Sequence, residues 1–345
     1  MPELKGLATG IGSLPYKDAD SALDLIFKYT PHIPFWPQLP KRDIKEGMVA
    51  QFSENLPGLK ADETGLRLVR SEAADDRLEM FYEKIINNDA DYFKISPDFA
   101  LGLHKFYQRL EKTSLKDIKF IKCQITGPFT FSSSLKDDKG NALLYDSVLL
   151  QAMIKGLMMK AQWQINLFRK FGKKIILFVD EPYLGCFGSA YTPINREDVI
   201  KNLEELTLGI KSENVLLGVH CCGNTDWSIF TEVKAIDIIN FDAFGFLDRF
   251  VLYADNLKDF LKRGGIICWG VVPTGEFSGH ETVDFLAQKI KNSINILINK
   301  GLDKDLLLDN LLLSPACGLG SMDIQKSESI FRLLSELSSS LRKNL

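Results

Sequence analysis

Apolar runs and amphipathic segments alternate along most of the chain. Beyond residue 117, six runs rich in β-branched and other apolar residues are each followed by a segment with the apolar spacing of a helix. The strands are predicted at 118–126, 174–180, 215–221, 236–242, 265–272 and 311–314. The helices are predicted at about 143–171, 196–209, 226–233, 254–263, 281–299 and 323–341. Strands that alternate with helices in this way favour parallel βα units.

The first third of the chain supplies two more candidate strands. Residues 7–13 form an apolar run that ends in small residues and precedes a helical pattern at 18–29. Residues 33–40 are apolar but contain three prolines, which predicts an irregular strand. We expect a helix at 43–54, and further helices with an inserted hairpin at 57–111.

Eight strands, each followed by a helix, predict an α/β fold of the (β/α)8 TIM barrel type that spans 1–345 as a single domain. A doubly wound open sheet is the alternative. That fold normally carries a G-x-G-x-x-G turn after its first strand, and the residues from Gly10 to Pro15 do not continue in this way. The barrel is therefore the preferred interpretation.

The charge and composition are those of a globular protein with no polyanionic partner. The chain has 42 basic and 45 acidic residues, a net charge of -3 and no long basic block, which argues against nucleic acid. No apolar run approaches the ~20 residues of a membrane span, and the first residues lack a signal-peptide pattern. We therefore expect a cytoplasmic location, where the six cysteines are free thiols or metal ligands.

Polar residues gather where the predicted strands end, which is the end of a barrel that carries the active site. The residues at these ends are Ser13, Gln38, Thr126, Asp180, Glu181, His220, Cys222, Asp242 and Cys317.

The sequence His220-Cys221-Cys222 is the most distinctive of these strand ends. Residues two apart on a strand share a face, so His220 and Cys222 point the same way and Cys221 points to the other side. Cys317 ends the eighth strand and can face the same cavity. These three residues predict a zinc site with an open fourth position, for which Asp242 is a candidate oxygen ligand. The alternative is a buried polar pair without metal. The remaining cysteines, Cys123, Cys186 and Cys268, are expected in the core.

A zinc site with two thiolates suits a substrate thiol, because a metal deprotonates a coordinated thiol and the thiolate is the nucleophile. The expected chemistry is alkylation of sulfur. Of the adjacent carboxylates Asp180 and Glu181, one should point into the barrel mouth and the other away. An inward Asp180 could hold the ammonium group of an amino acid. The alternative is that both carboxylates are loop charges or helix caps.

Four motifs together resemble a known family: Ile11-Gly12-Ser13, Asp180-Glu181-Pro182, His220-x-Cys222 and Pro315-Ala316-Cys317-Gly318-Leu319. They are similar to motifs in the C-terminal barrel of cobalamin-independent methionine synthase. His220-x-Cys222-Gly223 and Cys317-Gly318 also resemble the corrinoid-dependent methyltransferases that methylate coenzyme M. Both groups share a superfamily with uroporphyrinogen decarboxylase. The resemblance implies zinc at His220, Cys222 and Cys317, and homocysteine contacts from Ser13 and Asp180.

The departures from that pattern shape the expected reaction. The methionine synthases carry an additional N-terminal barrel that helps to bind folate, and this chain has no room for it, so we expect methylcobalamin or a methylated corrinoid protein as donor. The fourth zinc ligand of the family is a Glu, where this chain has Asp242. A Glu that contacts the amino acid is matched by the neutral Gln38, also expected to bind substrate.

The expected function is a zinc-dependent methyltransferase that converts a thiol, homocysteine first of all, to its methyl thioether. The alternatives are another zinc-dependent thiol alkyltransferase or lyase, acting for example on coenzyme M, and a metal-free enzyme like uroporphyrinogen decarboxylase. The last of these would leave His220, Cys222 and Cys317 unexplained.

Overall fold

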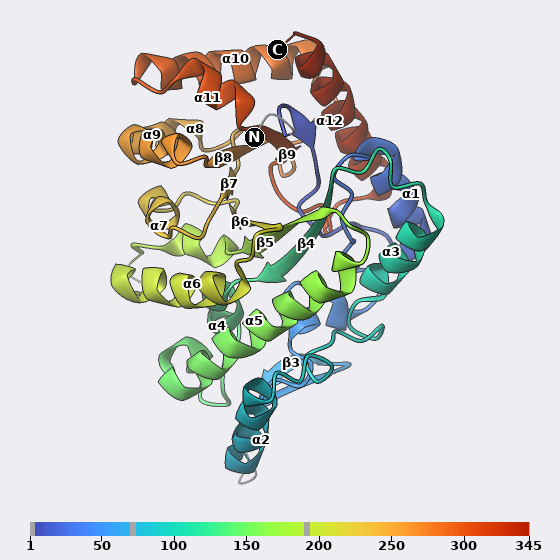
Figure 1. Cartoon of the computed structure of the whole chain (residues 1–345), viewed down its shortest axis with the longest axis vertical. Helices are drawn as coiled ribbons and strands as arrows, with labels where there is room; N and C mark the ends of the chain where they lie inside the picture. The colour runs from blue at the N-terminus through green and yellow to red at the C-terminus, as the bar shows by residue number, and fades with distance from the viewer. Residues whose placement is uncertain (1–3, 70–73, 190–193, 345) are drawn as a thin grey trace.

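Seven parallel strands curl into one sheet surrounded by helices (Figure 1). The structure is a computed structural model, and it describes residues 4–69, 74–189 and 194–344. The order of the strands around the sheet is β1-β9-β8-β7-β6-β5-β4. Their bounds are Leu7–Ala8 (β1), Phe120–Thr126 (β4), Lys174–Asp180 (β5), Val215–Cys221 (β6), Ile238–Phe241 (β7), Ile266–Val272 (β8) and Leu311–Pro315 (β9).

The segment 33–40 fills the position between β1 and β4. Phe35 forms a parallel bridge to Lys122 of β4, and Gln38 forms one to Ser13, just beyond β1. The three prolines of this segment lack the N–H groups that a continuous ladder needs, which explains why only isolated bridges form. The predicted (β/α)8 barrel and its irregular second strand are thus confirmed.

Helices follow the strands and cover the outside of the barrel (Figure 1). Among the described residues, no helix is both long and apolar enough to cross a membrane. The longer helices are α1 (Ala19–Tyr29), α3 (Leu101–Lys112), α5 (Ser147–Arg169), α6 (Arg196–Ile210), α9 (Ala254–Lys262), α10 (Val283–Asn299) and α12 (Ile324–Asn344). The shorter ones are α4 (Pro128–Ser133), α7 (Trp227–Glu232), α8 (Leu247–Phe250) and α11 (Lys304–Asp309). Single 3-10 turns are η3 (Leu143–Tyr145), η4 (Pro182–Cys186) and η5 (Val251–Tyr253).

The helix predicted at 43–54 is wrong. Two 3-10 turns occupy this stretch, η1 (Ile44–Glu46) and η2 (Ala50–Phe52). The backbone of Gly47 is extended, with φ -63° and ψ 148°, and this conformation stops the first turn. The apolar residues have the spacing of a helix, but the backbone conformation at Gly47 is not helical.

The hairpin predicted within 57–111 is confirmed. Strands β2 (Leu59–Asp62) and β3 (Gly65–Leu68) pair antiparallel and precede α2 (Ala74–Ile86). Figure 1 shows the hairpin and α2 at the periphery, outside the ring of helices. The buried ring of Phe81 in α2 lies against Gly156 of α5, so the insertion is anchored to the barrel through α5.

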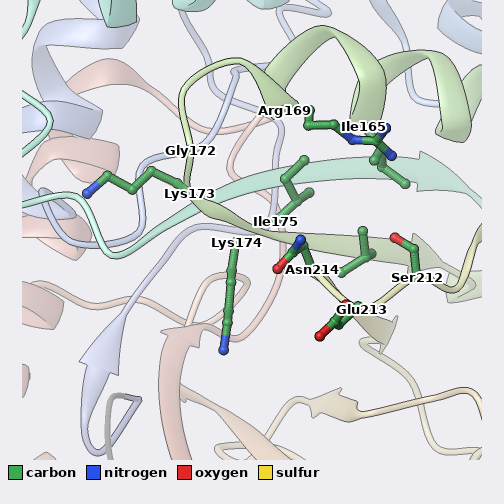
Figure 2. A pocket seen from close by; sticks show the side chains of 10 residues that line it. Ile165, Arg169, Gly172, Lys173, Lys174, Ile175, Ser212, Glu213 and Asn214 are labelled. Carbon is green, nitrogen blue, oxygen red and sulfur yellow. The ribbon is translucent and has the colours of Figure 1, made fainter.

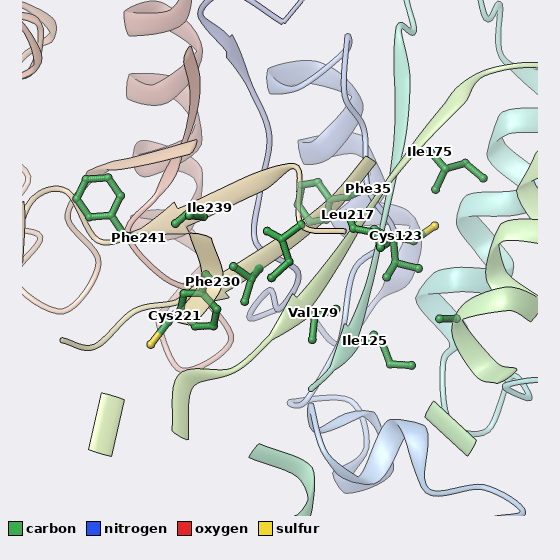
Figure 3. Close-up of a cluster of buried hydrophobic side chains, with 14 of the residues drawn as sticks. Phe35, Cys123, Ile125, Ile175, Val179, Leu217, Cys221, Phe230, Ile239 and Phe241 are labelled. Carbon is green, nitrogen blue, oxygen red and sulfur yellow. The ribbon is translucent and has the colours of Figure 1, made fainter. Parts of the chain in front are cut away.

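The core has two layers, as the two-residue period of a strand requires. Side chains such as Phe178 and Leu216 form a small apolar cluster inside the barrel. Their neighbours along the strands, including Leu217 and Cys221, join the larger cluster between sheet and helices (Figure 3). Cys221 therefore faces the helices, as predicted, which leaves His220 for the barrel interior.

Candidate metal centre and substrate pocket

The three predicted metal ligands meet at the carboxyl end of the barrel. His220 lies near the end of β6, Cys222 follows β6, and Cys317 lies two residues beyond β9. One ligand atom from each lies within 4.8 Å of the other two. In a tetrahedral zinc site with Zn–S of about 2.3 Å and Zn–N of about 2.0 Å, ligand atoms are about 3.5 to 3.8 Å apart. The donor set and its spacing therefore fit Zn²⁺ with three protein ligands.

The contact between the two thiols shifts their pKa values in opposite directions. The hydrogen bond between them raises the pKa of Cys222 and lowers the pKa of Cys317. Burial opposes protonation of His220, but the hydrogen bond and the charge of Cys317 together raise its pKa. This cluster stabilises negative charge on Cys317, which is the form that binds a metal.

The adjacent carboxylates at the end of β5 point to different environments, as predicted. Asp180 pairs in register with His220 and is 4% exposed, and burial raises its pKa to about 6. Its Oδ1 accepts no hydrogen bond from the described residues. Glu181 is a helix cap, because it accepts hydrogen bonds from the N–H groups of Phe129 and Thr130 at the start of α4, at 2.9 and 2.8 Å.

Ser13 lies beside Gly318, the residue that follows Cys317. Its Oγ is so close to Gly318 that a Cβ built on this glycine would be 2.5 Å from it. The backbone N–H of Leu319 donates to the carbonyl of Ser13 at 2.9 Å. The glycine after Cys317 thus lets the two loops touch, and this contact places Ser13 next to the loop that carries Cys317.

Gln38 and Gln124 lie on the far side of the same loop, against Gly12. A Cβ on Gly12 would be 3.0 Å from Gln38 Oε1 and 3.3 Å from the side-chain amide of Gln124. Gln38 Nε2 donates to Gln51 Oε1 at 3.0 Å, which fixes its orientation. The Oε1 of Gln124 is buried and accepts no hydrogen bond from the described part of the chain.

Asp242 follows β7 and is bound by its own loop. Its Oδ1 accepts from the N–H groups of Phe244 and Gly245 at 2.9 and 2.8 Å. The carboxylate is not in the group whose ligand atoms lie within 4.8 Å of one another. Its role as a fourth ligand stays a prediction.

Sequence reasoning missed two buried polar residues beside the site. Lys122 of β4 is fully buried, donates to the carbonyl of Ile11 at 2.6 Å and lies 4.5 Å from the ring of Phe178. Burial lowers the pKa of this lysine to about 8, and the charge of Asp180 opposes the shift. Asn240 of β7 is also fully buried, and its Oδ1 lies 2.5 Å from Nδ1 of His220. The signal in both cases is a polar residue inside an apolar strand.

Two of the three remaining cysteines are buried as expected, and one is exposed. Cys123 and Cys268 are buried, as predicted. Cys186 is exposed at the end of η4, so its assignment to the core is wrong. The turn η4 begins at Pro182 and carries the chain away from β5 over the surface, which explains the exposure.

A cavity of about 420 Å³ opens at the opposite end of the barrel (Figure 2). It lies between the end of α5 and the starts of β5 and β6, and basic side chains such as Arg169 and Lys174 line it. Barrel enzymes carry their chemistry at the carboxyl end of the strands, and the group of His220, Cys222 and Cys317 is at that end. We therefore assign the functional site to the mouth, not to this cavity.

Comparisons with protein-family models and with curated proteins found no match. Among solved structures, a fungal β-1,4-galactanase is weakly similar, with a TM-score of 0.39 and 13% identity over 67% of this chain and 82% of that chain. A B12-independent methionine synthase from Shewanella sp. W3-18-1 matches with a TM-score of 0.58 and 17% identity, over 99% of this chain and 98% of that chain. The chain therefore shares its fold, from end to end, with a methionine synthase.

Proposed function

We propose that this protein is a zinc-dependent methyltransferase that methylates the thiol of homocysteine and so forms methionine. The observation that carries the proposal is the group of His220, Cys222 and Cys317 at the barrel mouth, with ligand atoms within 4.8 Å of one another. Zinc held by an imidazole and two thiolates supplies an open position at which a substrate thiol is stabilised as the thiolate.

The rest of the mouth suits the polar end of an amino acid. Asp180 Oδ1 and Gln124 Oε1 are buried acceptors that find no donor among the described residues. A buried acceptor left in this state costs roughly 1 to 3 kcal/mol, so a bound ammonium group that donates to it is favoured. Ser13 lies at Gly318 and can donate its hydroxyl to a carboxylate. We propose that these residues orient homocysteine with its sulfur toward Cys222 and Cys317.

The fold comparison supports this choice of substrate. The structure from Shewanella was determined in complex with selenomethionine, which has the skeleton of the proposed product. We propose methylcobalamin or a methylated corrinoid protein as methyl donor. The Shewanella protein is described as B12-independent, and this chain matches 98% of it. The length of this chain therefore does not decide between a corrinoid and another methyl donor. The donor must be tested directly.

The test is methionine formation by the zinc-loaded protein from homocysteine and methylcobalamin, with methyltetrahydrofolate and coenzyme M as comparison donor and acceptor. Methionine from methylcobalamin supports the full proposal. Product only from the folate would keep the acceptor and replace the donor.

Metal analysis separates the remaining alternatives. The purified protein should contain one zinc per chain, bound through Cys317. Zinc without methylation of any thiol would favour a different zinc-dependent reaction, such as a lyase. Absence of zinc binding would overturn the proposal and leave the metal-free decarboxylase-like alternative.

A further inference from the structure

Asn240 connects the two strands that carry His220 and Cys317. Its Oδ1 lies 2.5 Å from Nδ1 of His220 on β6. Its Nδ2 donates to the carbonyl of Cys268 on β8 at 2.9 Å and to Oγ of Ser314 on β9 at 2.8 Å. Asn240 and Ser314 are fully buried. One side chain on β7 thus joins β6, β8 and β9 inside the barrel.

The partners of Asn240 determine which way its amide faces. A backbone carbonyl is only an acceptor, so the atom of Asn240 that contacts the carbonyl of Cys268 must be the NH₂ group. Ser314 is consistent with this orientation, because its own hydroxyl donates to the carbonyl of Pro315 at 2.9 Å and leaves a lone pair for Asn240. The Oδ1 atom of Asn240 is therefore the one that faces His220.

This orientation selects one tautomer of His220. An amide oxygen accepts hydrogen bonds and cannot donate them, so Nδ1 of His220 must carry the proton. In the neutral ring the lone pair is then on Nε2. Metal-binding histidines commonly donate their other ring N–H to an acceptor of this kind, which fixes the orientation of the ring.

The same contacts also link the two strands that carry His220 and Cys317. Ser314 lies three residues before Cys317, and its hydroxyl bonds the carbonyl of Pro315, at the end of β9. The chain of hydrogen bonds from His220 through Asn240 to Ser314 therefore runs from one metal ligand to the strand end that positions another.

We propose that Asn240 is a positioning residue of the metal centre, which presents Nε2 of His220 to the zinc and holds β6 and β9 at the separation the ligands need. This inference rests on the zinc site of the proposed function. It assigns a role to a residue that touches neither metal nor substrate.

The experiment measures zinc affinity by competition with a chelator for the wild-type protein and for Asn240→Leu, Asn240→Asp and Ser314→Ala. Asn240→Leu should weaken zinc binding by about 10 to 100-fold, the usual effect of losing a partner of a metal ligand. Asn240→Asp keeps an acceptor for His220 but loses the donor to β8 and β9, so its zinc affinity should fall less than that of Asn240→Leu. Asn202→Leu, at a buried asparagine of α6 outside the site, is the matched control and should bind zinc like the wild type.

A spectroscopic readout distinguishes positioning from a general loss of packing. In the wild-type zinc protein labelled with ¹⁵N-histidine, NMR should show His220 protonated at Nδ1 with Nε2 shifted by the metal. Asn240→Leu should lose this single form, and its cobalt-substituted protein should show altered d–d bands while thiolate charge-transfer bands persist.

Two results would overturn the inference, and they are distinguishable. If the wild type binds zinc while Asn240→Leu and Ser314→Ala match it in affinity and spectra, Asn240 does not position the centre, although the proposed function stands. If the wild type binds no zinc, both proposals fail together.

Discussion

Strands β6 and β9 bring a nitrogen and two sulfur atoms to one half of the barrel mouth, whereas β4, β5 and the segment 33–40 bring oxygen acceptors to the other half. In the first half, the ring of His220 is oriented by a hydrogen bond to Asn240. In the second half, Asp180 and Gln124 each have a buried oxygen that no described residue satisfies. We call the part with His220, Cys222 and Cys317 the metal half, and the part with Asp180 and Gln124 the oxygen half.

Protein contacts satisfy one of the two adjacent carboxylates at the end of β5 and leave an oxygen of the other open. Glu181 shows the first case, since the start of α4 supplies its donors. Asp180, the residue before it, shows the second. Under the proposed function, zinc binds in the metal half and the cationic end of the substrate binds in the oxygen half. Substitutions in each half should therefore have separable effects.

The largest effect is expected from Cys317→Ser in the metal half. A hydroxyl is a far poorer zinc ligand than a thiolate, so zinc affinity should fall by more than the roughly 100-fold that outer partners of a metal site contribute. Zinc content after dialysis, measured by atomic spectroscopy, checks this. Cys186→Ser, at the exposed cysteine of η4, is the control and should keep its zinc. Stoichiometric zinc in Cys317→Ser would remove this cysteine from the ligand set.

A smaller and different effect is expected from Asp180→Asn in the oxygen half. Zinc content should be unchanged. Loss of a charged hydrogen bond worth about 1.5 to 3 kcal/mol should lower kcat/KM for homocysteine roughly 10 to 150-fold. Steady-state kinetics should be repeated with a thiol acid that lacks the amino group.

The amine-free thiol is the decisive comparison for Asp180. The wild type and Asp180→Asn should methylate it with similar kcat/KM, because no ammonium group is present to be held. If Asp180→Asn lowers kcat/KM equally for both thiols, Asp180 does not contact the ammonium group. A loss of zinc in Asp180→Asn would mean that Asp180 also supports the metal site. Substitutions in the two halves would then not have separable effects.

Much of this arrangement follows from the two-residue period of strands and from the ends of parallel strands meeting at one edge. These rules placed His220 and Cys222 on one face, sent Cys221 to the helices and brought Cys317 to the same cavity. They work because side chains two apart on a strand share a face whatever their polarity, so the strand assignment alone gives their relative directions.

The sequence could not predict which partner satisfies a buried polar residue. Asn240 and Lys122 each lie in an apolar strand, and their partners come from residues distant in sequence, such as Ser314 and Ile11. Those contacts depend on the layer that each side chain occupies inside the closed barrel, which no local pattern records. The same holds at Gly47, where one extended glycine ends a turn that apolar spacing would continue.

The smallest functional effect is expected from Thr130→Val. This substitution removes a hydrogen bond to Glu181 and does not affect Asp180. The hydroxyl of Thr130 donates to Glu181 at 2.7 Å and accepts from the N–H of Tyr183 at 3.1 Å. Its loss should lower the free energy of unfolding by about 1 to 3 kcal/mol without changing zinc content or kcat/KM. Thr207→Val, at a buried threonine bonded within α6, is the matched control.

The pH dependence of the Thr130→Val effect identifies its cause. Burial raises the pKa of Glu181 to about 7, and the hydrogen bond from Thr130 opposes that rise. A carboxyl whose folded pKa lies above its unfolded value makes the protein less stable as pH rises through that interval. Removal of the hydroxyl raises the folded pKa further, so denaturant unfolding should show a larger loss at pH 8 than at pH 5. A loss that is equal at both pH values would mean that the Thr130 side chain contributes by packing and that its hydroxyl does not stabilise the carboxylate of Glu181.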